Sequence, residues 1–543
     1  MKETTKKAVK ARYLLWIVSL LCAVVLLGYA AFTKMLPGKY LLIAGLVFVL
    51  LFAGFFWWQR KGKLPKLIFI ALLEIVIGAG SVYGVNVLYH TNHMVENITQ
   101  QVAETVTVSV YVKKDKNYNT LNDVVEQPFG MVKDQSEDSV DAFLQDVVNA
   151  SDVNLDVTAY AGMFDAADAL HNDEIQVLVL DEAYAPMFLE VEGYEWFETE
   201  TKMLWNSTQE LAITKREISS QIAMTDQQDN TQETMEAPAE ESKETEENTE
   251  EKKVVKKEVA PPKMELMEPP EQVDWNTLVN QDMISAPAGS YVIYISGADT
   301  WGQASTKSRS DVNIIAVVNT NTKKILLVST PRDYYVPLSV SNGVKDKLTH
   351  AGLYGINCSM DTLGALYGVS IPYYVKVNFT GFVNIVNAVG GVDVYSESDF
   401  TVEPEFHYVA GMNHLDGIQA LAFARERYSF AAGDRARGNH QMEVIRAVIN
   451  KCISPSILYN YADVMNGVSG SFSTNISKDT IASLVRMQLN DMAGWDIQSM
   501  SVDGSGANKA TYSVKGKALY VMVPNESTVQ SAKDRISAVL NGN

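Results

Sequence analysis

The chain has 543 residues, of which 47% are hydrophobic and 20% charged, so it is long enough for several domains and is neither wholly disordered nor wholly apolar. Its 65 acidic residues outnumber its 45 basic ones and give a net charge of −20. Residues 1–66, however, hold eleven Lys and Arg and a single acid, so the rest of the chain carries −30. Nucleic-acid binding needs a basic footprint and is therefore excluded for the bulk of the chain. Three cysteines exclude a disulfide-rich scaffold and a four-cysteine zinc site within one chain.

Three apolar runs open the sequence, at residues 13–33, 40–58 and 67–89. Each is about as long as the ~20 residues that cross a hydrocarbon core, so we expect a membrane anchor of three transmembrane helices over residues 1–92. Glu74 lies inside the third run, where a carboxylate is a candidate functional group, but we expect it to pack against a neighbouring helix or to snorkel inward.

The orientation of this anchor follows from its Lys and Arg residues. The N-terminal tail has five of them and the second loop four, whereas the first loop has only Lys34 and Lys39. We therefore predict a cytoplasmic N-terminus and an extracellular location for everything after residue 89.

Residues 95–218 alternate strand-like and helix-like segments and predict a small extracellular α/β accessory module. The expected segments are strands at 105–112, 154–161 and 175–180, and helices at 139–150 and 166–174. Asp181 and Glu182 follow the last strand and could face a ligand, but we expect a solvated loop there. Residues 219–274 then predict a disordered linker, because 226–251 has eleven acids and one Lys, and a Pro-containing stretch follows.

Residues 275–543 form the predicted main domain, a mixed-sheet α/β fold. Strands are expected at 291–297, on both sides of a turn within 312–330, and at 371–379. Helices are expected at 380–389, 434–451, 478–492 and 527–540. Charged side chains collect at the ends of these elements: Asp299, Arg309, Asp311, Arg332, Arg425, Arg427, and the helical stripe Asp434, Arg437 and Gln441.

This set of arginines and aspartates suggests phosphate chemistry. The planar fork of arginine matches phosphate oxygens, and aspartates together with phosphate oxygens are the ligands that Mg²⁺ selects. If the fold brings these residues together, they would form a pyrophosphate clamp. The alternative is a set of surface ion pairs, such as Arg309 with Asp311. No Gly-x-Ser-x-Gly elbow, Walker loop or His-Glu-x-x-His motif offers another scheme. Cys358 and Cys452 could pair, or either could be a free thiol.

Five stretches within residues 291–450 resemble the LytR–CpsA–Psr family, in the order expected for it. They are YISGADTWGQASTKSRSDVNII, KKILLVSTPRDYYVPL, KLTHAGLYG, YYVKVNFTGFVNIVNAVGGVDV and LDGIQALAFARERYSFAAGDRARGNHQMEVI. The resemblance implies a membrane-anchored phosphotransferase of a Gram-positive type of envelope. It would move a teichoic acid or capsule glycopolymer from an undecaprenyl-pyrophosphate carrier to peptidoglycan, with Mg²⁺.

The resemblance also implies roles for single residues. Asp299 and Asp311 match the metal-binding acids of the family. The residues that match its pyrophosphate-contacting set are Arg309, Arg332, Arg425, Arg427, Arg437 and Gln441, with Asp434 beside them. Either Asp311 or Asp434 could take the acceptor proton, and metal activation alone could also suffice. Met442 and the pair Asn439-His440 depart from the family pattern.

The same residues are compatible with two other classes of function. A polyprenyl-pyrophosphate hydrolase would use the same clamp with water as the acceptor. A non-catalytic envelope-binding or regulatory protein would bind without turnover. Transfer and hydrolysis differ in acceptor binding, which the sequence does not show.

Overall fold

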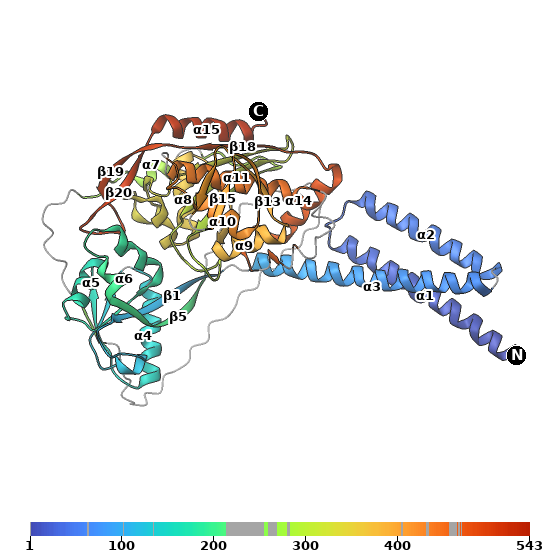
Figure 1. Cartoon of the computed structure of the whole chain (residues 1–543), viewed down its shortest axis with the longest axis horizontal. Helices are drawn as coiled ribbons and strands as arrows, with labels where there is room; N and C mark the ends of the chain where they lie inside the picture. The colour runs from blue at the N-terminus through green and yellow to red at the C-terminus, as the bar shows by residue number, and fades with distance from the viewer. Residues whose placement is uncertain are drawn as a thin grey trace, which may run out of the picture. The chain divides into compact units, whose positions relative to one another are not determined.

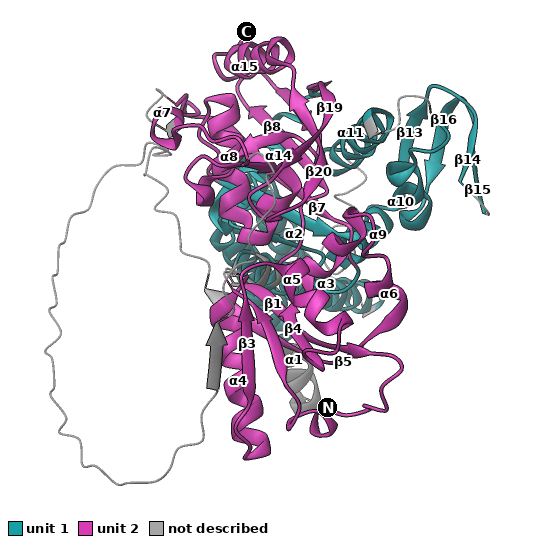
Figure 2. Cartoon of the chain, turned by 90° about the vertical axis from the view of Figure 1, so that its left-hand side faces the viewer, with its two compact units in different colours: residues 1–102, 301–304, 373–497 teal, residues 103–300, 305–372, 498–543 magenta. Residues whose placement is uncertain are grey.

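The computed structural model describes residues 2–61, 64–100, 103–133, 135–212, 255–258, 269–279, 283–402, 405–430, 434–454, 464, 467–468 and 470–543. The chain divides into two compact units that do not follow chain order (Figure 2). Unit 1 comprises residues 1–102, 301–304 and 373–497, and unit 2 comprises residues 103–300, 305–372 and 498–543. The acidic stretch 226–251 lies outside the described residues, so its disorder stays a prediction.

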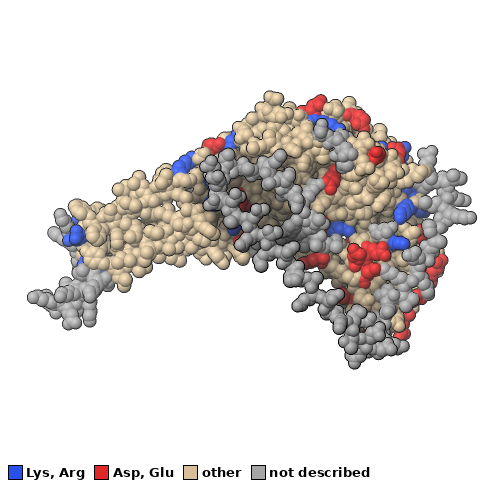
Figure 3. Space-filling view, turned by 180° about the vertical axis from the view of Figure 1, so that it is seen from behind, with Lys and Arg blue, Asp and Glu red and all other residues tan. Residues whose placement is uncertain are grey.

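Unit 1 begins with three long helices, as the apolar runs predict (Figure 1). They are α1 (Lys2–Phe32), α2 (Gly38–Lys61) and α3 (Leu64–Gln100). The parts long and apolar enough to span a membrane are Arg12–Phe32, Gly38–Arg60 and Pro65–His93. On the face shown in Figure 3, these helices carry few charged side chains. Because unpaired charge is costly in hydrocarbon, this surface suits a lipid environment.

Two hydrogen bonds join Glu74 of α3 to the neighbouring helices. The Ser19 hydroxyl donates to the Glu74 carbonyl oxygen at 2.8 Å, and Gln59 Nε2 donates to Glu74 Oε1 at 2.6 Å. Glu74 is 1% exposed, which confirms the expectation that it packs against its neighbours. Such interhelical bonds hold helices together where the lipid gives no hydrophobic driving force.

The accessory module lies in unit 2 and has a mixed six-stranded sheet in the order β5-β1-β4-β2-β3-β6. Its strands are β1 (Ala103–Lys113), β2 (Phe129–Val132), β3 (Asp156–Tyr160), β4 (Val177–Asp181), β5 (Thr201–Ala212) and β6 (Val255–Glu258). Its helices are η1 (Leu121–Asp123), α4 (Glu137–Ser151), α5 (Met163–His171), η2 (Glu182–Glu190) and α6 (Trp196–Glu200). The expected strands and helices are confirmed, whereas β2 and β5 were not predicted.

Strand β6 corrects the prediction for the linker. It lies inside residues 219–274, which composition marks as disordered, yet it pairs in parallel with β3 from Asp156 opposite Val255 to Ala159 opposite Glu258. Its sequence, VKKE, has no strand-like alternation of its own. The neighbouring edge strand supplies the hydrogen-bonding template, which composition alone does not reveal.

The main-domain part of unit 2 is built on three antiparallel strands. They are β7 (Ser290–Ala298), β8 (Val312–Asn319) and β9 (Lys324–Thr330). Their inner positions are almost fully buried. The helices and turns around them are α7 (Trp275–Val279), η3 (Ser339–Ser341), η4 (Leu348–Tyr354), α8 (Ile356–Tyr367) and α15 (Glu526–Leu540). Two hairpins complete the unit: β10 (Tyr335–Pro337) with β11 (Lys345–Lys347), and β19 (Gly504–Ala510) with β20 (Ala518–Pro524).

The main-domain part of unit 1 packs helices against short strands around an apolar core. Its helices are α9 (Phe379–Ala388), α10 (Gly417–Arg425), α11 (Asp434–Cys452) and α14 (Lys478–Asp491). Its strands are β12 (Tyr373–Asn378), β13 (Val392–Ser396), β14 (Phe400–Val402), β15 (Phe406–Tyr408), β16 (Gly411–Leu415) and β17 (Phe472–Thr474), and β18 (Asp496–Ser501) begins here and ends in unit 2. The four helices expected in the main domain are confirmed within two residues. Cys358 and Cys452 are free thiols.

Candidate active site

Three of the predicted site residues lie at one end of the β7–β8–β9 strands. Asp299 directly follows β7 and Asp311 directly precedes β8. Gly297 lies opposite Val312 in the register, and the Asp311 amide donates to the Gly297 carbonyl oxygen at 2.8 Å. Arg332 follows β9, which runs antiparallel to β8 and so ends at the same edge. The topology therefore places two acids and one arginine at a single edge of the sheet.

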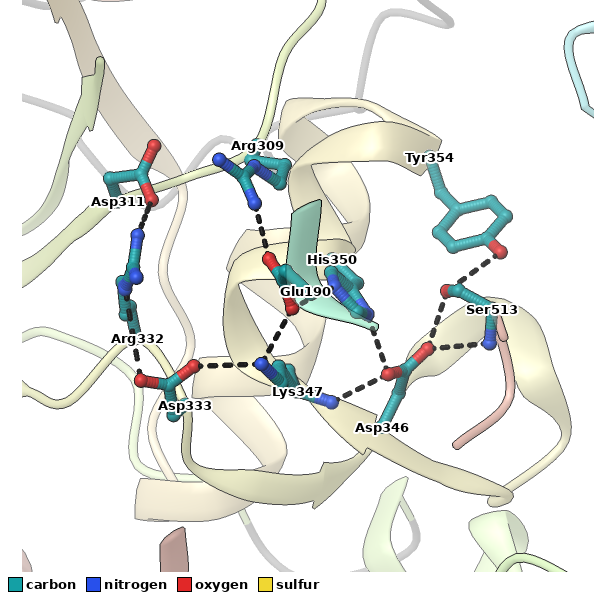
Figure 4. Close-up of polar contacts among 10 residues, drawn as sticks. All are labelled: Glu190, Arg309, Asp311, Arg332, Asp333, Asp346, Lys347, His350, Tyr354 and Ser513. Carbon is teal, nitrogen blue, oxygen red and sulfur yellow. Dashed lines mark hydrogen bonds and ion pairs between the residues drawn. The ribbon is translucent and has the colours of Figure 1, made fainter. Parts of the chain in front are cut away.

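Asp311 and Arg332 form a direct ion pair at this edge (Figure 4). Arg332 Nη1 donates to Asp311 Oδ1 at 2.7 Å, and Arg332 Nε lies 3.7 Å from Asp333 Oδ2. The exposed fractions of the Arg332 and Asp311 side chains are 22% and 7%. Burial alone would lower the pKa of the Arg332 guanidinium, but the charges of Asp311 and Asp333 outweigh burial and raise it.

Arg309 has a different partner from the one expected. One interpretation of the sequence is a surface ion pair between Arg309 and Asp311, two residues away. Arg309 Nη1 instead donates to Glu190 Oε1 of the accessory module. Glu190 Oε2 accepts from Lys347 Nζ at 2.6 Å, and Lys347 Nζ also lies 3.2 Å from Asp333 Oδ1. Figure 4 shows these contacts as one chain of alternating charges from Asp311 to Arg309. Sequence reasoning missed Glu190 and Lys347.

The Glu190 carboxylate is strongly held in its ionised form. Burial alone would raise its pKa, but the electrostatic interactions with His350, Lys347 and Arg309 lower the pKa to about 2. The carboxylate is therefore charged at neutral pH. It behaves as a fixed anion bound by cations of the main domain.

A second polar cluster adjoins Glu190. His350 Nδ1 lies 2.7 Å from Asp346 Oδ1, and the other Asp346 oxygen accepts from the Ser513 amide at 2.7 Å. The Tyr354 hydroxyl lies 3.0 Å from Ser513 Oγ. His350 and Asp346 are both 0% exposed. His350 Nε2 has no hydrogen-bond partner among the described residues and lies 3.9 Å from Glu190 Oε2. Because a carboxylate oxygen of Asp346 accepts, Nδ1 is the donor in this contact. The other ring nitrogen, Nε2, lies on the side of Glu190.

The other predicted arginines lie in unit 1. Arg425 ends α10, and its guanidinium lies 4.3 Å from the centre of the Phe379 ring. Arg427 Nη2 donates to the Tyr428 hydroxyl at 2.6 Å. Phe379 also contacts Trp301 edge-on at 5.4 Å, and Trp301 is 61% exposed. An exposed arginine stacked on an aromatic ring keeps its hydrogen-bond donors available to an anion.

Helix α11 carries the last members of the predicted set. Arg437 and Gln441 are half-buried and lie one turn apart on this helix. Asp434 opens the helix, and its side chain lies outside the described residues. Two residues that depart from the family pattern are packed in the core of this part. Met442 is 3% exposed, and the centre of the His440 ring lies 4.5 Å from the centre of the Phe423 ring.

The donor set at the sheet edge fits Mg²⁺ better than zinc. Among the described residues, no three His, Cys, Asp or Glu side chains form a metal-binding group, so a closed zinc site is not built there. Mg²⁺ takes one or two carboxylates, keeps several waters and completes its shell with substrate phosphates. Asp299 and Asp311 at one edge supply two such carboxylates.

Comparison with known proteins gives the chain its relatives. The family described as LytR_cpsA_psr matches residues 231–535. A protein of Bacillus mycoides named polyisoprenyl-teichoic acid–peptidoglycan teichoic acid transferase TagU is 36% identical over 219 residues, which are 40% of this chain and 70% of the relative. A protein of the same name from Enterococcus faecalis is 35% identical over 191 residues, 35% of this chain and 62% of the relative.

Among solved structures, TagV of B. subtilis aligns with 25% identity and a TM-score of 0.40, over 46% of this chain and 97% of that one. The structure titled TagT bound to LI-WTA aligns with 26% identity and a TM-score of 0.38, over 47% and 91%. Given its helices of membrane-spanning length and relatives named as transferases, the chain is a membrane-anchored α/β transferase. It belongs to the LytR–CpsA–Psr family, because the family match covers more than half of its length.

Proposed function

We propose that this chain is an extracellular phosphotransferase that moves a teichoic acid or capsule type of glycopolymer from an undecaprenyl-pyrophosphate carrier to peptidoglycan. The observation that carries the proposal is the edge of the β7–β8–β9 strands, where Asp299, Asp311 and Arg332 converge. The names of the curated relatives, which specify a polyisoprenyl-linked teichoic acid and peptidoglycan, support the two substrates.

In the proposed reaction, a hydroxyl oxygen of peptidoglycan attacks the phosphorus that carries the glycan. A new P–O bond forms, the P–O bond of the pyrophosphate bridge breaks, and polyprenyl monophosphate leaves with the electron pair. The hydroxyl proton passes to a carboxylate of the site, for which Asp311 and Asp434 are the candidates. The arginines Arg332, Arg425, Arg427 and Arg437, with Gln441, stabilise the charge that spreads over the phosphoryl oxygens.

Mg²⁺ is part of this proposal. Asp299 and Asp311 would hold the ion, which neutralises phosphate charge when bound. Arg332 already donates to one Asp311 oxygen, so the guanidinium orients the carboxylate and leaves its second oxygen for the metal. Arranging ligands through neighbouring hydrogen bonds is a general feature of metal sites.

The proposed reaction requires the site to face the envelope. The basic N-terminal tail and second loop predict that the N-terminus is cytoplasmic and that residues after about 90 are outside. With this topology, the accessory module and the main domain would lie on the side of the membrane where peptidoglycan is found.

The test is a transfer assay with the full-length protein in lipid nanodiscs, a polyprenyl-pyrophosphate-linked glycan and peptidoglycan. Arg332→Lys and Arg425→Lys keep the charge but lose the planar fork, and we expect each to lower kcat/KM by about 10²–10³-fold. The matched control is Arg535→Lys on α15, where the native arginine bonds only to the Gln498 side chain among the described residues. Full transfer by both site variants would place the phosphotransferase site elsewhere.

A further inference from the structure

The accessory module reaches into the candidate active site through one side chain. Glu190 is the last residue of η2, and its two carboxylate oxygens contact different cations of the main domain. Oε1 accepts from Arg309 Nη1, and Oε2 accepts from Lys347 Nζ at 2.6 Å. Figure 4 shows the carboxylate between these two cations, with His350 beside it.

The burial of this cluster shows that it is built rather than incidental. The side chains of Glu190 and Arg309 are each 16% exposed, and that of Lys347 is 6% exposed. Exposed ion pairs are held loosely and contribute little, whereas charges this buried need fixed partners. Lys347 meets this need with two carboxylates, Glu190 and Asp333.

The accessory module is also fixed at several other points to the main-domain part of unit 2. Lys307 Nζ lies 3.1 Å from Asp181 Oδ2, and the Ile356 amide donates to Glu104 Oε2 at 3.1 Å. The Thr105 amide donates to the Ser305 carbonyl oxygen at 3.1 Å. Accessory side chains also share one apolar cluster with Leu353, Val514 and Leu519. A docked module, rather than a free loop, therefore delivers Glu190.

We propose that Glu190 is a positioning residue of the transferase site, so that the accessory module is part of the active site rather than a separate binding module. This inference rests on the proposed function. Glu190 fixes one terminal nitrogen of Arg309 and leaves the rest of the guanidinium to meet a phosphate. Its second partner, Lys347, also pairs with Asp333, so the carboxylate that holds Arg309 is itself fixed in place.

The physical basis is the flexibility of arginine. An arginine side chain has several rotatable bonds, and ordering it at the moment of binding costs conformational entropy. A carboxylate that holds the guanidinium in advance removes that cost from substrate binding. Groups that orient a binding residue in this way change activity by about 10–100-fold when they are removed.

The experiment measures transfer kinetics for Glu190→Gln in the full-length protein in nanodiscs. Glutamine has nearly the same shape but lacks the charge. The matched control is Glu192→Gln, two residues along the chain at an exposed position. We expect Glu190→Gln to lower kcat/KM by about 10–100-fold and Glu192→Gln to leave it unchanged.

A coupling measurement separates positioning from a merely structural role. Arg309→Lys and the double variant Glu190→Gln/Arg309→Lys are assayed beside the single Glu190→Gln variant, all below their unfolding temperatures. If Glu190 acts through Arg309, the double variant is no slower than Arg309→Lys alone, because effects that pass through one residue do not add. Multiplied losses in the double variant would overturn the inference.

Three further outcomes are decisive. A rise in kcat/KM for Glu190→Gln would overturn the inference, since it would show that the carboxylate competes with the substrate for Arg309. Equal kinetics for Glu190→Gln and Glu192→Gln, in a wild-type protein that transfers, would overturn the inference alone. A wild-type protein that transfers nothing would instead overturn the proposed function on which the inference rests.

Discussion

The ion pair between Lys307 and Asp181 allows a stability prediction that tests how the accessory module docks. The two side chains are 7% and 1% exposed, and Lys307 Nζ lies 3.1 Å from Asp181 Oδ2. The Ser136 hydroxyl donates to the same carboxylate at 2.7 Å, and the Ala183 amide donates to Oδ1 at 3.0 Å. The sequence had suggested a solvated loop at residues 181–182, and for Asp181 that interpretation is wrong.

Asp181→Asn removes the charge and leaves Lys307 buried without its counter-ion. Breaking a buried pair in this way costs about 3–5 kcal/mol. For a unit of this size, the midpoint of thermal unfolding should fall by roughly 5–10 °C. The matched control is Asp173→Asn. The native Asp173 side chain is 47% exposed, and its Oδ1 lies 3.1 Å from Lys113 Nζ and 3.0 Å from Lys116 Nζ. An exposed pair is worth about 0–1 kcal/mol, so the control should shift the midpoint little.

The assay is differential scanning calorimetry of the full-length protein in detergent at neutral pH. The double variant Lys307→Met/Asp181→Asn should recover more than half of the loss, because it removes the unpaired buried charge while the amide oxygen at position 181 can still accept a hydrogen bond. A midpoint for Asp181→Asn equal to that of Asp173→Asn would refute the reasoning. A double variant less stable than Asp181→Asn would also refute it.

Three further predictions follow from the site and the anchor. The ionised Glu190 carboxylate contributes its full stabilisation above the ordinary pKa of a glutamate, about 4.5. This contribution to the free energy of unfolding is lost as the pH falls toward the pKa in the folded protein, about 2. When unfolding is monitored by fluorescence at a series of acid pH values, the free energy of unfolding of the wild type should fall by roughly 3 kcal/mol more than that of Glu190→Gln across this pH window. Parallel plots of that free energy against pH would contradict this. Asp311→Ala should abolish transfer, and so should excess chelator added to the wild type. Added Mg²⁺ should restore transfer by the chelated wild type but not by the variant. Full turnover in excess chelator would refute the metal assignment. Protease added to intact protoplasts should remove the accessory module and the main domain. A C-terminus that is protected from the protease would show the opposite topology.

The sequence predicted the features that depend on local pattern. The three apolar runs became α1, α2 and α3, and the strand at 105–112 became the centre of β1. Asp299, Asp311 and Arg332 were found because each follows or precedes a strand end, and antiparallel pairing of β7, β8 and β9 brings such ends to one edge. Hydropathy and strand period carry this information directly.

The partners of Arg309 and Lys307 could not be predicted from local pattern. Glu190 lies 119 residues before Arg309, and Lys307 lies 171 residues after Ser136, which accepts its hydrogen bond. Nothing marks Glu190 within an acidic stretch that also holds Glu192 and Glu195. Such pairs depend on how one module docks on another, so only the tertiary structure identifies them. The local-pair interpretation of Arg309 with Asp311 is wrong for the same reason.

The central claim is phosphotransfer to peptidoglycan, and the most direct test is to identify the products. The full-length protein in nanodiscs is incubated with a radiolabelled polyprenyl-pyrophosphate-linked glycan and peptidoglycan, and the products are analysed by mass spectrometry. The proposed function predicts glycan joined to peptidoglycan through a phosphodiester, together with polyprenyl monophosphate in equal amount. Polyprenyl monophosphate with free phosphorylated glycan, at the same rate with and without peptidoglycan, would contradict it and show a hydrolase.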